Sequence, residues 1–244
     1  MLNNKINKLS ILIISSMLSS VVFADNGDTR YGPATKFEVT LKKAEFCTDA
    51  ACTTAHTLVT KTSAMNISSA AVGAEVGGYA STMTLPPMGV TYTHMRSTVD
   101  RTFSITGYGA SSGTAGHYCY TDGSAGGKTA YAAGTFASTA AAAAAAATAS
   151  ALEAPTPGDV TAFINGGTAT FSGFSYDSGY TVSGDDMLVV TALTTPYTYY
   201  GQTPIIDISF ATTTGVSSVE AGSGDDSNDC NLFPGPPTMI ITIK

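Results

Sequence analysis

The sequence predicts a mainly β protein, with a β-sandwich or jelly-roll-like fold and one Ala-rich helix. Three observations predict it. Short stretches rich in Thr, Val, Ile, Tyr and Phe recur along the chain, turn sequences with Gly, Asp, Asn and Pro separate them, and one run of eight alanines interrupts them. With 244 residues, of which 43% are hydrophobic, the chain can bury a substantial core. We interpret it as a single β domain; two smaller β domains, split near the alanine run, are the alternative.

The first 24 residues have the features of a secretory signal peptide. Two lysines near the start precede a mostly apolar stretch, residues 9–23, and Val22 and Ala24 place small residues at positions −3 and −1 of a cleavage site. The apolar run is about 15 residues long, shorter than the ~20 that a bilayer span needs. We expect cleavage after Ala24 and a mature chain, residues 25–244, that is secreted, at the cell surface or in a periplasm, with no membrane span.

The strand predictions follow the alternation of apolar and polar residues. Residues 36–46 begin with strict alternation, and Lys42 and Lys43 then shift its phase, which predicts a bulge or a strand end. The clearest strand signal, residues 90–106, follows a turn at residues 86–89. Further strands are expected at residues 57–60, 65–67, 117–121, 160–164, 168–175, 187–193, 205–211 and 238–243.

Residues 138–154 are the exception to the β pattern. The unbroken alanines at 140–147 favour a helix, a serine or threonine before them can cap it, and Pro155 and Pro157 end it. We therefore expect one helix over residues 138–154. It could be a connector over one end of the sandwich, a contact between subunits, or a low-complexity linker.

The mature chain has four cysteines, and an even number in an exported chain indicates disulfides. Of the three possible pairings we favour a local Cys47–Cys52 bond and a long-range Cys119–Cys230 bond. In the chain-entropy model, closing a loop of over 100 residues stabilises the fold by about 4 kcal/mol. A metal site would need CxxC pairs or a nearby histidine, and only His117 lies close in sequence to a cysteine.

Composition and motifs argue against several functional classes. Acidic residues outnumber basic ones 18 to 11, whereas nucleic-acid and polybasic membrane-surface binders need clustered Lys and Arg. The three histidines are not at metal-ligand spacing, and the chain has no GxSxG elbow, no P-loop and no GxGxxG before a helix. We therefore expect no catalytic activity and no cofactor.

An acidic loop before Cys230 is a candidate calcium site. Its carboxylate and amide side chains are the oxygen ligands that Ca²⁺ takes in extracellular loops. The alternative is that they are solvated turn residues, since Asp and Asn favour turns. The residues are Asp225, Asp226, Asn228 and Asp229.

Tyr197, Tyr199 and Tyr200 form the one aromatic cluster that stands out as a binding candidate. Exposed tyrosines can stack on sugars or anchor a protein interface. The absence of Trp weakens the sugar interpretation. The alternative is that these rings cover the edge of the core.

The C-terminal strand leads to the functional hypothesis. Residues 239–243 are almost entirely apolar, so the strand needs partners at both edges or a buried position. Residues 25–34 are polar and expected to be mobile, and a chain end beside such a strand can exchange between subunits. Only 12% of residues are charged. We expect a secreted structural or cell-surface subunit that forms a filament or matrix with itself or other surface proteins; the alternative is a secreted binding module for a glycan or a protein partner.

Overall fold

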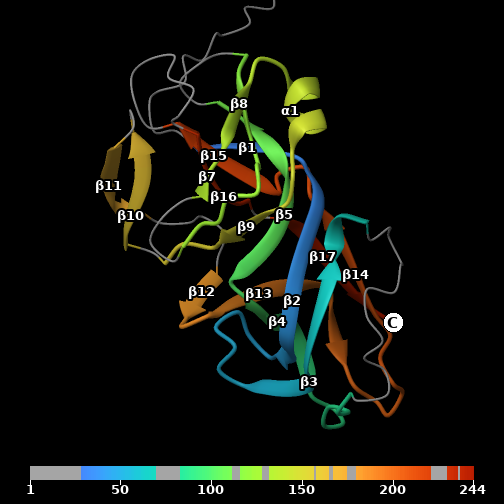
Figure 1. Ribbon diagram of the computed structural model, residues 1–244. Helices are drawn as coiled ribbons and strands as arrows, with labels where there is room; N and C mark the ends of the chain where they lie inside the picture. The colour runs from blue at the N-terminus through green and yellow to red at the C-terminus, as the bar shows by residue number, and fades with distance from the viewer. Residues whose placement is uncertain are drawn as a thin grey trace, which may run out of the picture.

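Antiparallel strands dominate the computed structural model (Figure 1), in agreement with the predicted fold class. The structure describes residues 29–69, 83–111, 116–127, 132–156, 158–164, 167–174, 180–220, 230–235 and 237–244. The expected signal peptide thus lies outside the described residues. Within them, no helix has the length and hydropathy needed to cross a membrane.

A long strand pair forms the centre of the fold. Strand β2 (Ala34–Cys47) runs antiparallel to β4 (Thr91–Asp100) and then to β5 (Thr102–Ala110), which follow each other along the same edge of β2. The opposite edge of β2 pairs with β3 (Ala55–Asn66). Both ladders shift register between Leu41 and Lys43, so the irregularity predicted at Lys42 and Lys43 is present.

The central sheet has nine strands in all, including β2, β3, β4 and β5. The free edge of β4 pairs with β13, which also carries β12, and the free edge of β5 pairs with β9 and β6, which continues to β8. The strands added in this way are β12 (Tyr180–Ser183), β13 (Asp186–Thr198), β9 (Ser150–Glu153), β6 (Tyr118–Tyr120) and β8 (Thr135–Ala137).

Three smaller sheets complete the described structure. A four-stranded sheet has the order β1-β15-β16-β7, and two two-stranded sheets are β14-β17 and β10-β11. Figure 1 shows β10 and β11 at one side of the molecule, and the C-terminus beside β14. The bounds are β1 (Thr29–Gly32), β15 (Val216–Glu220), β16 (Cys230–Pro234), β7 (Ala132–Ala133), β14 (Ile206–Ala211), β17 (Thr238–Ile243), β10 (Gly158–Ile164), β11 (Gly167–Phe174), a 3₁₀ turn η1 (Ile67–Ser69) and helix α1 (Ala140–Ala146).

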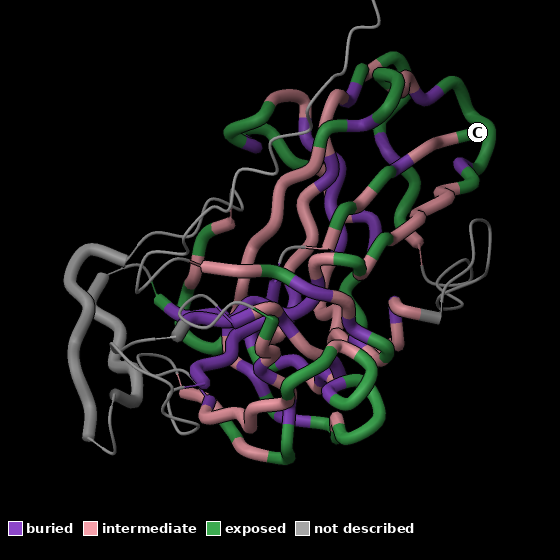
Figure 2. Tube along the Cα trace, turned by 90° about the horizontal axis from the view of Figure 1, so that it is seen from above, coloured by how far each residue is buried: buried purple, intermediate pink, exposed green. Residues whose placement is uncertain are grey.

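Two hydrophobic cores lie along β2. The first surrounds its N-terminal half and includes Phe37, Ile105 and Leu152; the second surrounds its C-terminal end and includes Phe46 and Ile241. Figure 2 shows the buried stretches, in purple, along the interior of the described chain. Residues from before and after the alanine run contribute to both cores, so this run is not a boundary between two separately packed halves.

Arg101 lies at the bend between β4 and β5 and is 2% exposed. Its guanidinium donates to the carbonyl oxygens of Ala154 and Gly184 and to the hydroxyl of Thr156, with Nε 3.0 Å from the Ala154 oxygen. A buried cation is tolerated when hydrogen bonds replace its water. Arg101 therefore joins the bend to the end of β9 and to the turn between β12 and β13.

The predicted helix over residues 138–154 is wrong in its C-terminal half. Helix α1 begins after Thr139, whose hydroxyl accepts from the Ala142 N–H at 3.1 Å, and ends at Ala146. Ala143 is its one buried residue, so a longer alanine helix would bury little more. Residues 150–153 instead form β9, which pairs with β5 and buries Leu152 completely. Apolar burial and a sheet ladder outweigh the helix propensity of alanine here.

The expectation of a mobile N-terminal segment, residues 25–34, is wrong for its described part. Thr29–Gly32 forms β1, which pairs with β15, and Ala34 is buried. Close backbone contact with β5 explains this order. A Cβ atom at Gly32 would lie 2.1 Å from the Tyr108 carbonyl oxygen, and one at Gly107 would lie 2.4 Å from the Pro33 carbonyl oxygen. Only glycine permits this approach.

The structure has two disulfides, Cys47–Cys52 and Cys119–Cys230, which is the pairing favoured from the sequence. The first closes the loop between β2 and β3. The second joins β6 of the central sheet to β16 of the four-stranded sheet across 111 residues of chain. Both sulfur pairs are buried.

Substitution of Gly107 by alanine should destabilise the protein by about 2 kcal/mol, because the added methyl group overlaps the Pro33 carbonyl and the Val216 side chain. Gly127→Ala is the matched control, since a Cβ there meets nothing within 4 Å. Urea unfolding of both variants measures the effect. Equal stability of the two variants would show that β5 does not pack this closely against Pro33 and Val216.

The two disulfides should contribute unequally to stability. Replacing Cys119 and Cys230 together by serine should cost about 4–5 kcal/mol, whereas the Cys47 and Cys52 double variant should lose about 2 kcal/mol, because loop-closure entropy grows with loop length. Denaturant midpoints of the two double variants test this order. A larger loss in the short-loop variant would contradict it.

Candidate functional site

The predicted calcium site lies outside the described residues. Asp225, Asp226, Asn228 and Asp229 all fall between the described ends of β15 and β16. In the part of the chain that the structure describes, no group of three or more His, Cys, Asp or Glu side chains could hold a metal ion. The calcium site therefore stays a prediction from sequence.

The three tyrosines of the predicted binding cluster have different environments. The Tyr197 ring packs against Phe46, with centroids 5.5 Å apart, and burial raises the pKa of its hydroxyl. Tyr199 is only 6% exposed, whereas Tyr200 is 76% exposed. The three rings thus do not form one exposed platform: Tyr197 packs against the second core, Tyr199 is buried and Tyr200 is exposed.

Tyr197 and Tyr200 nevertheless line one surface hollow. Its volume is about 280 Å³. The remaining lining residues come from the end of β13 and its following turn and from the C-terminus: Thr198, Gln202 and Lys244. The sequence analysis did not identify Gln202 and Lys244, because Lys244 is 42 residues from Gln202 and no local pattern joins them.

The β14–β17 pair covers the second core with one face and exposes the other. Ile208 and Ile241 belong to the second core, and Ile241 is fully buried. On the outer face Ile240 is 53% exposed, and Ile205, next to β14, is 62% exposed. Exposed large apolar residues are the informative exception on a protein surface. The apolar run at residues 239–243 reflects this arrangement, because the strand carries apolar side chains on both its buried and its exposed face.

The outer edge of β14 has backbone groups available for another strand. Ile205 and Lys244 exchange both backbone hydrogen bonds, each 2.9 Å long. Alternation along the antiparallel ladder then directs the N–H and C=O groups of Ile206, Ile208 and Phe210 away from β17. No strand of the described structure pairs with this edge. Its only charged side chain, Asp207, is already bound to Lys244.

The edge of β3, by contrast, is protected. Lys61 lies in the middle of this strand, and the ladder to β2 shifts register twice. Charged residues and bulges are the devices by which natural proteins prevent edge-to-edge pairing. The β14 edge is therefore better suited than the β3 edge to accept a strand.

Two neighbouring loops add apolar side chains at the same end of the molecule. The Gly89 N–H donates to the Tyr199 carbonyl at 2.9 Å, which holds residues 83–90 beside residues 199–205. Neither loop contains a charged residue. Met88 and Leu85 are exposed in the first and Tyr200 in the second.

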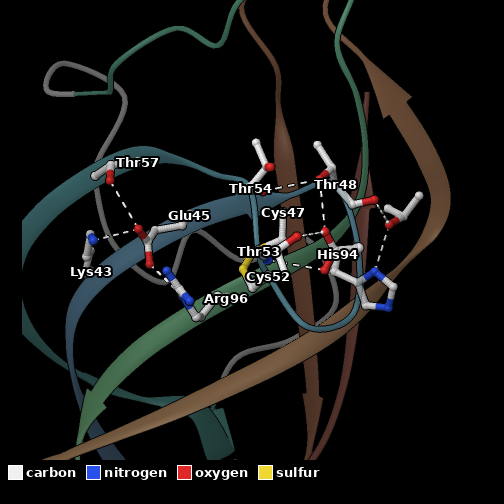
Figure 3. Close-up of a disulfide and its surroundings, with 12 residues drawn as sticks. Lys43, Glu45, Cys47, Thr48, Cys52, Thr53, Thr54, Thr57, His94 and Arg96 are labelled. Carbon is white, nitrogen blue, oxygen red and sulfur yellow. Dashed lines mark hydrogen bonds and ion pairs between the residues drawn. A yellow bond between two sulfur atoms is a disulfide. The ribbon is translucent and has the colours of Figure 1, made fainter.

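A buried carboxylate joins β2 and β4 through ion pairs. Figure 3 shows Glu45 between Lys43 and Arg96, close to the Cys47–Cys52 disulfide. The distances are 2.6 Å from Lys43 Nζ and 2.8 Å from Arg96 Nε to the two carboxylate oxygens. Thr57 donates to the same carboxylate at 3.2 Å. These partners satisfy a carboxylate that is 5% exposed.

A second ion-pair group neutralises two facing aspartates. Asp100 and Asp186 are opposite each other in the β4–β13 ladder. Lys42 Nζ lies 3.0 Å from one carboxylate and 2.6 Å from the other. Hydrogen bonds to Asp186 and Asp100 raise the pKa of Lys42. Lys42 thus stays protonated and holds the two strands in register.

Glu45→Gln should lower the free energy of unfolding by about 1–3 kcal/mol at pH 7, because Lys43 and Arg96 lose their buried partner. Burial alone would raise the pKa of Glu45, but hydrogen bonds from Arg96 and Lys43 hold that pKa below its usual value. The stabilisation is therefore present above the unfolded pKa, about 4.3, and is lost as pH falls through the folded pKa.

Urea unfolding at pH 7 and pH 3 measures this effect. The difference in the free energy of unfolding between wild type and variant should be smaller at pH 3 than at pH 7. Glu38→Gln is the matched control, since its pair with Lys36 is exposed and contributes little. A stability difference that does not change with pH would contradict the stabilising role of the Glu45 carboxylate.

Comparison of the chain with protein-family models, with curated proteins and with solved structures gives no match in any of the three. The function must therefore be inferred from this chain's own surface, because a fold class by itself does not define an activity.

Proposed function

We propose that this chain is an exported structural subunit that assembles with further copies of itself through the β14–β17 pair. The observation that carries the proposal is the outer edge of β14, where Ile206, Ile208 and Phe210 direct backbone donors and acceptors away from their own sheet. An added strand satisfies such an edge with main-chain hydrogen bonds.

The outer face of the same pair supports a contact between identical copies. Asp207 and Lys244 are the only charged side chains at its positions, they have opposite signs, and they bind each other. Two copies can therefore meet there without like-charge repulsion. Ile205 and Ile240 supply exposed apolar area beside the edge.

The rest of the chain suits a durable extracellular component. Two disulfides indicate an oxidising environment outside the cytoplasm. One of them fixes the four-stranded sheet to the central sheet, and Arg101 fixes the bend of the central strand. Only 12% of the residues are charged, which leaves few charges to oppose association.

Light scattering and negative-stain microscopy of the disulfide-bonded protein test the proposal. We expect higher-order species whose fraction rises with concentration. Ile205→Lys and Ile240→Lys should shift the protein to monomer, because each places a charge on the contact face while leaving the core intact. Deleting residues 239–244 is a poorer test, since it removes the buried Ile241.

Thr60→Lys is the matched control, because it adds the same charge to an exposed position of β3. It should leave the assembly unchanged. A monomer at every concentration, or assembly that survives both isoleucine substitutions, would overturn the proposal.

A further inference from the structure

We infer that the hollow between the end of β13 and the C-terminus binds a neutral glycan, one or two sugar rings at a time. This inference does not require the assembly proposed above, although Lys244 belongs to both surfaces. Five side chains line it: Tyr197, Thr198, Tyr200, Gln202 and Lys244.

The fold holds the Tyr197 ring and positions the backbone on either side of Tyr200. Tyr197 packs on Phe46 of the second core. Tyr200 projects because its neighbour Tyr199 is buried and because the Tyr199 carbonyl accepts the Gly89 N–H. Gly201, at φ +98°, then reverses the chain. The Tyr200 ring is 76% exposed and can therefore present its apolar face to a ligand.

The polar groups of the hollow are arranged around these rings. Thr198 Oγ1 lies 2.8 Å from Thr91 Oγ1, so its orientation is fixed. Lys244 is anchored through its backbone to Ile205 and through its ammonium to Asp207. Gln202 adds an amide with donors and an acceptor. Aromatic faces beside hydroxyl, amide and ammonium groups match the C–H faces and hydroxyl edges of a sugar ring.

Charge and size select the class of ligand. The Lys244–Asp207 pair leaves no uncompensated positive charge, so phosphate or carboxylate groups gain little there. Pockets for drug-sized ligands have volumes of about 300–1,000 Å³, and 280 Å³ is at the lower end of that range. One or two uncharged rings of a longer glycan fit this space better than a compact charged metabolite.

Saturation-transfer NMR with four hexasaccharides tests the inference: laminarihexaose, cellohexaose and chitohexaose as neutral probes, and an alginate hexamer as the acidic probe. The measurement uses the disulfide-bonded Ile240→Lys protein, so that assembly cannot cover the hollow. We expect saturable transfer to at least one neutral probe. Tyr200→Ala should weaken that binding at least tenfold, and Tyr200→Phe should largely retain it, because the ring face rather than the hydroxyl makes the contact.

Tyr31→Phe, a change on an exposed tyrosine in β1, serves as the matched control and should not alter binding. Thermal unfolding of the Tyr200 variants should match that of the parent, since this side chain is outside the core. Transfer to none of the neutral probes, binding of the alginate hexamer alone, or binding that survives Tyr200→Ala would each overturn the inference. None of these outcomes depends on whether the protein assembles.

Discussion

The pairing of β2 with the continuous β4–β5 strand is the constraint on which the rest of the structure depends. Both cores pack along β2. Strand β3 pairs with β2 itself, and every other strand of the central sheet attaches to β4 or β5 directly or through a neighbour. At the bend, the β9 side and the β13 side diverge. Arg101 occupies that point and binds carbonyls from both sides. A buried cation thus joins the two sides of the sheet at the bend.

Local sequence patterns predict the parts of the fold that local interactions determine. The strand at residues 36–46, its irregularity at Lys42 and Lys43, and the β class all follow from alternation and turn residues. The same reasoning fails where a strand distant in sequence determines the local structure. Residues 150–153 leave the helix because β5 offers a ladder and a buried place for Leu152. Residues 29–32 are ordered because β15 lies almost 190 residues away in sequence but beside them in space.

Prediction of the surface sites from local sequence patterns has the same limit. Three neighbouring tyrosines give a compositional signal, but only the packing on Phe46 and the turn at Gly201 determine that Tyr200 is the exposed ring. Lys244 lines that hollow because its backbone pairs with Ile205. No pattern in the sequence predicts this pairing. The assembly hypothesis from sequence rests on the apolar C-terminal strand, residues 239–243. The exposed backbone row, however, belongs to its partner β14.

The sequence separation of the strand partners has a consequence for the order of folding. The first core needs β15 and β16 and the Cys119–Cys230 bond, and the second needs Ile241. Neither core can therefore close until nearly the whole chain has been synthesised. Contacts between distant residues also slow folding, because a long loop must close before any of them stabilises the chain. Only sequence-local elements can form early, such as the Cys47–Cys52 loop and the β10–β11 and β12–β13 pairs. Until β14–β17 have been synthesised, the strands that need these distant partners lack them, and their unpaired edges favour association between copies of the chain.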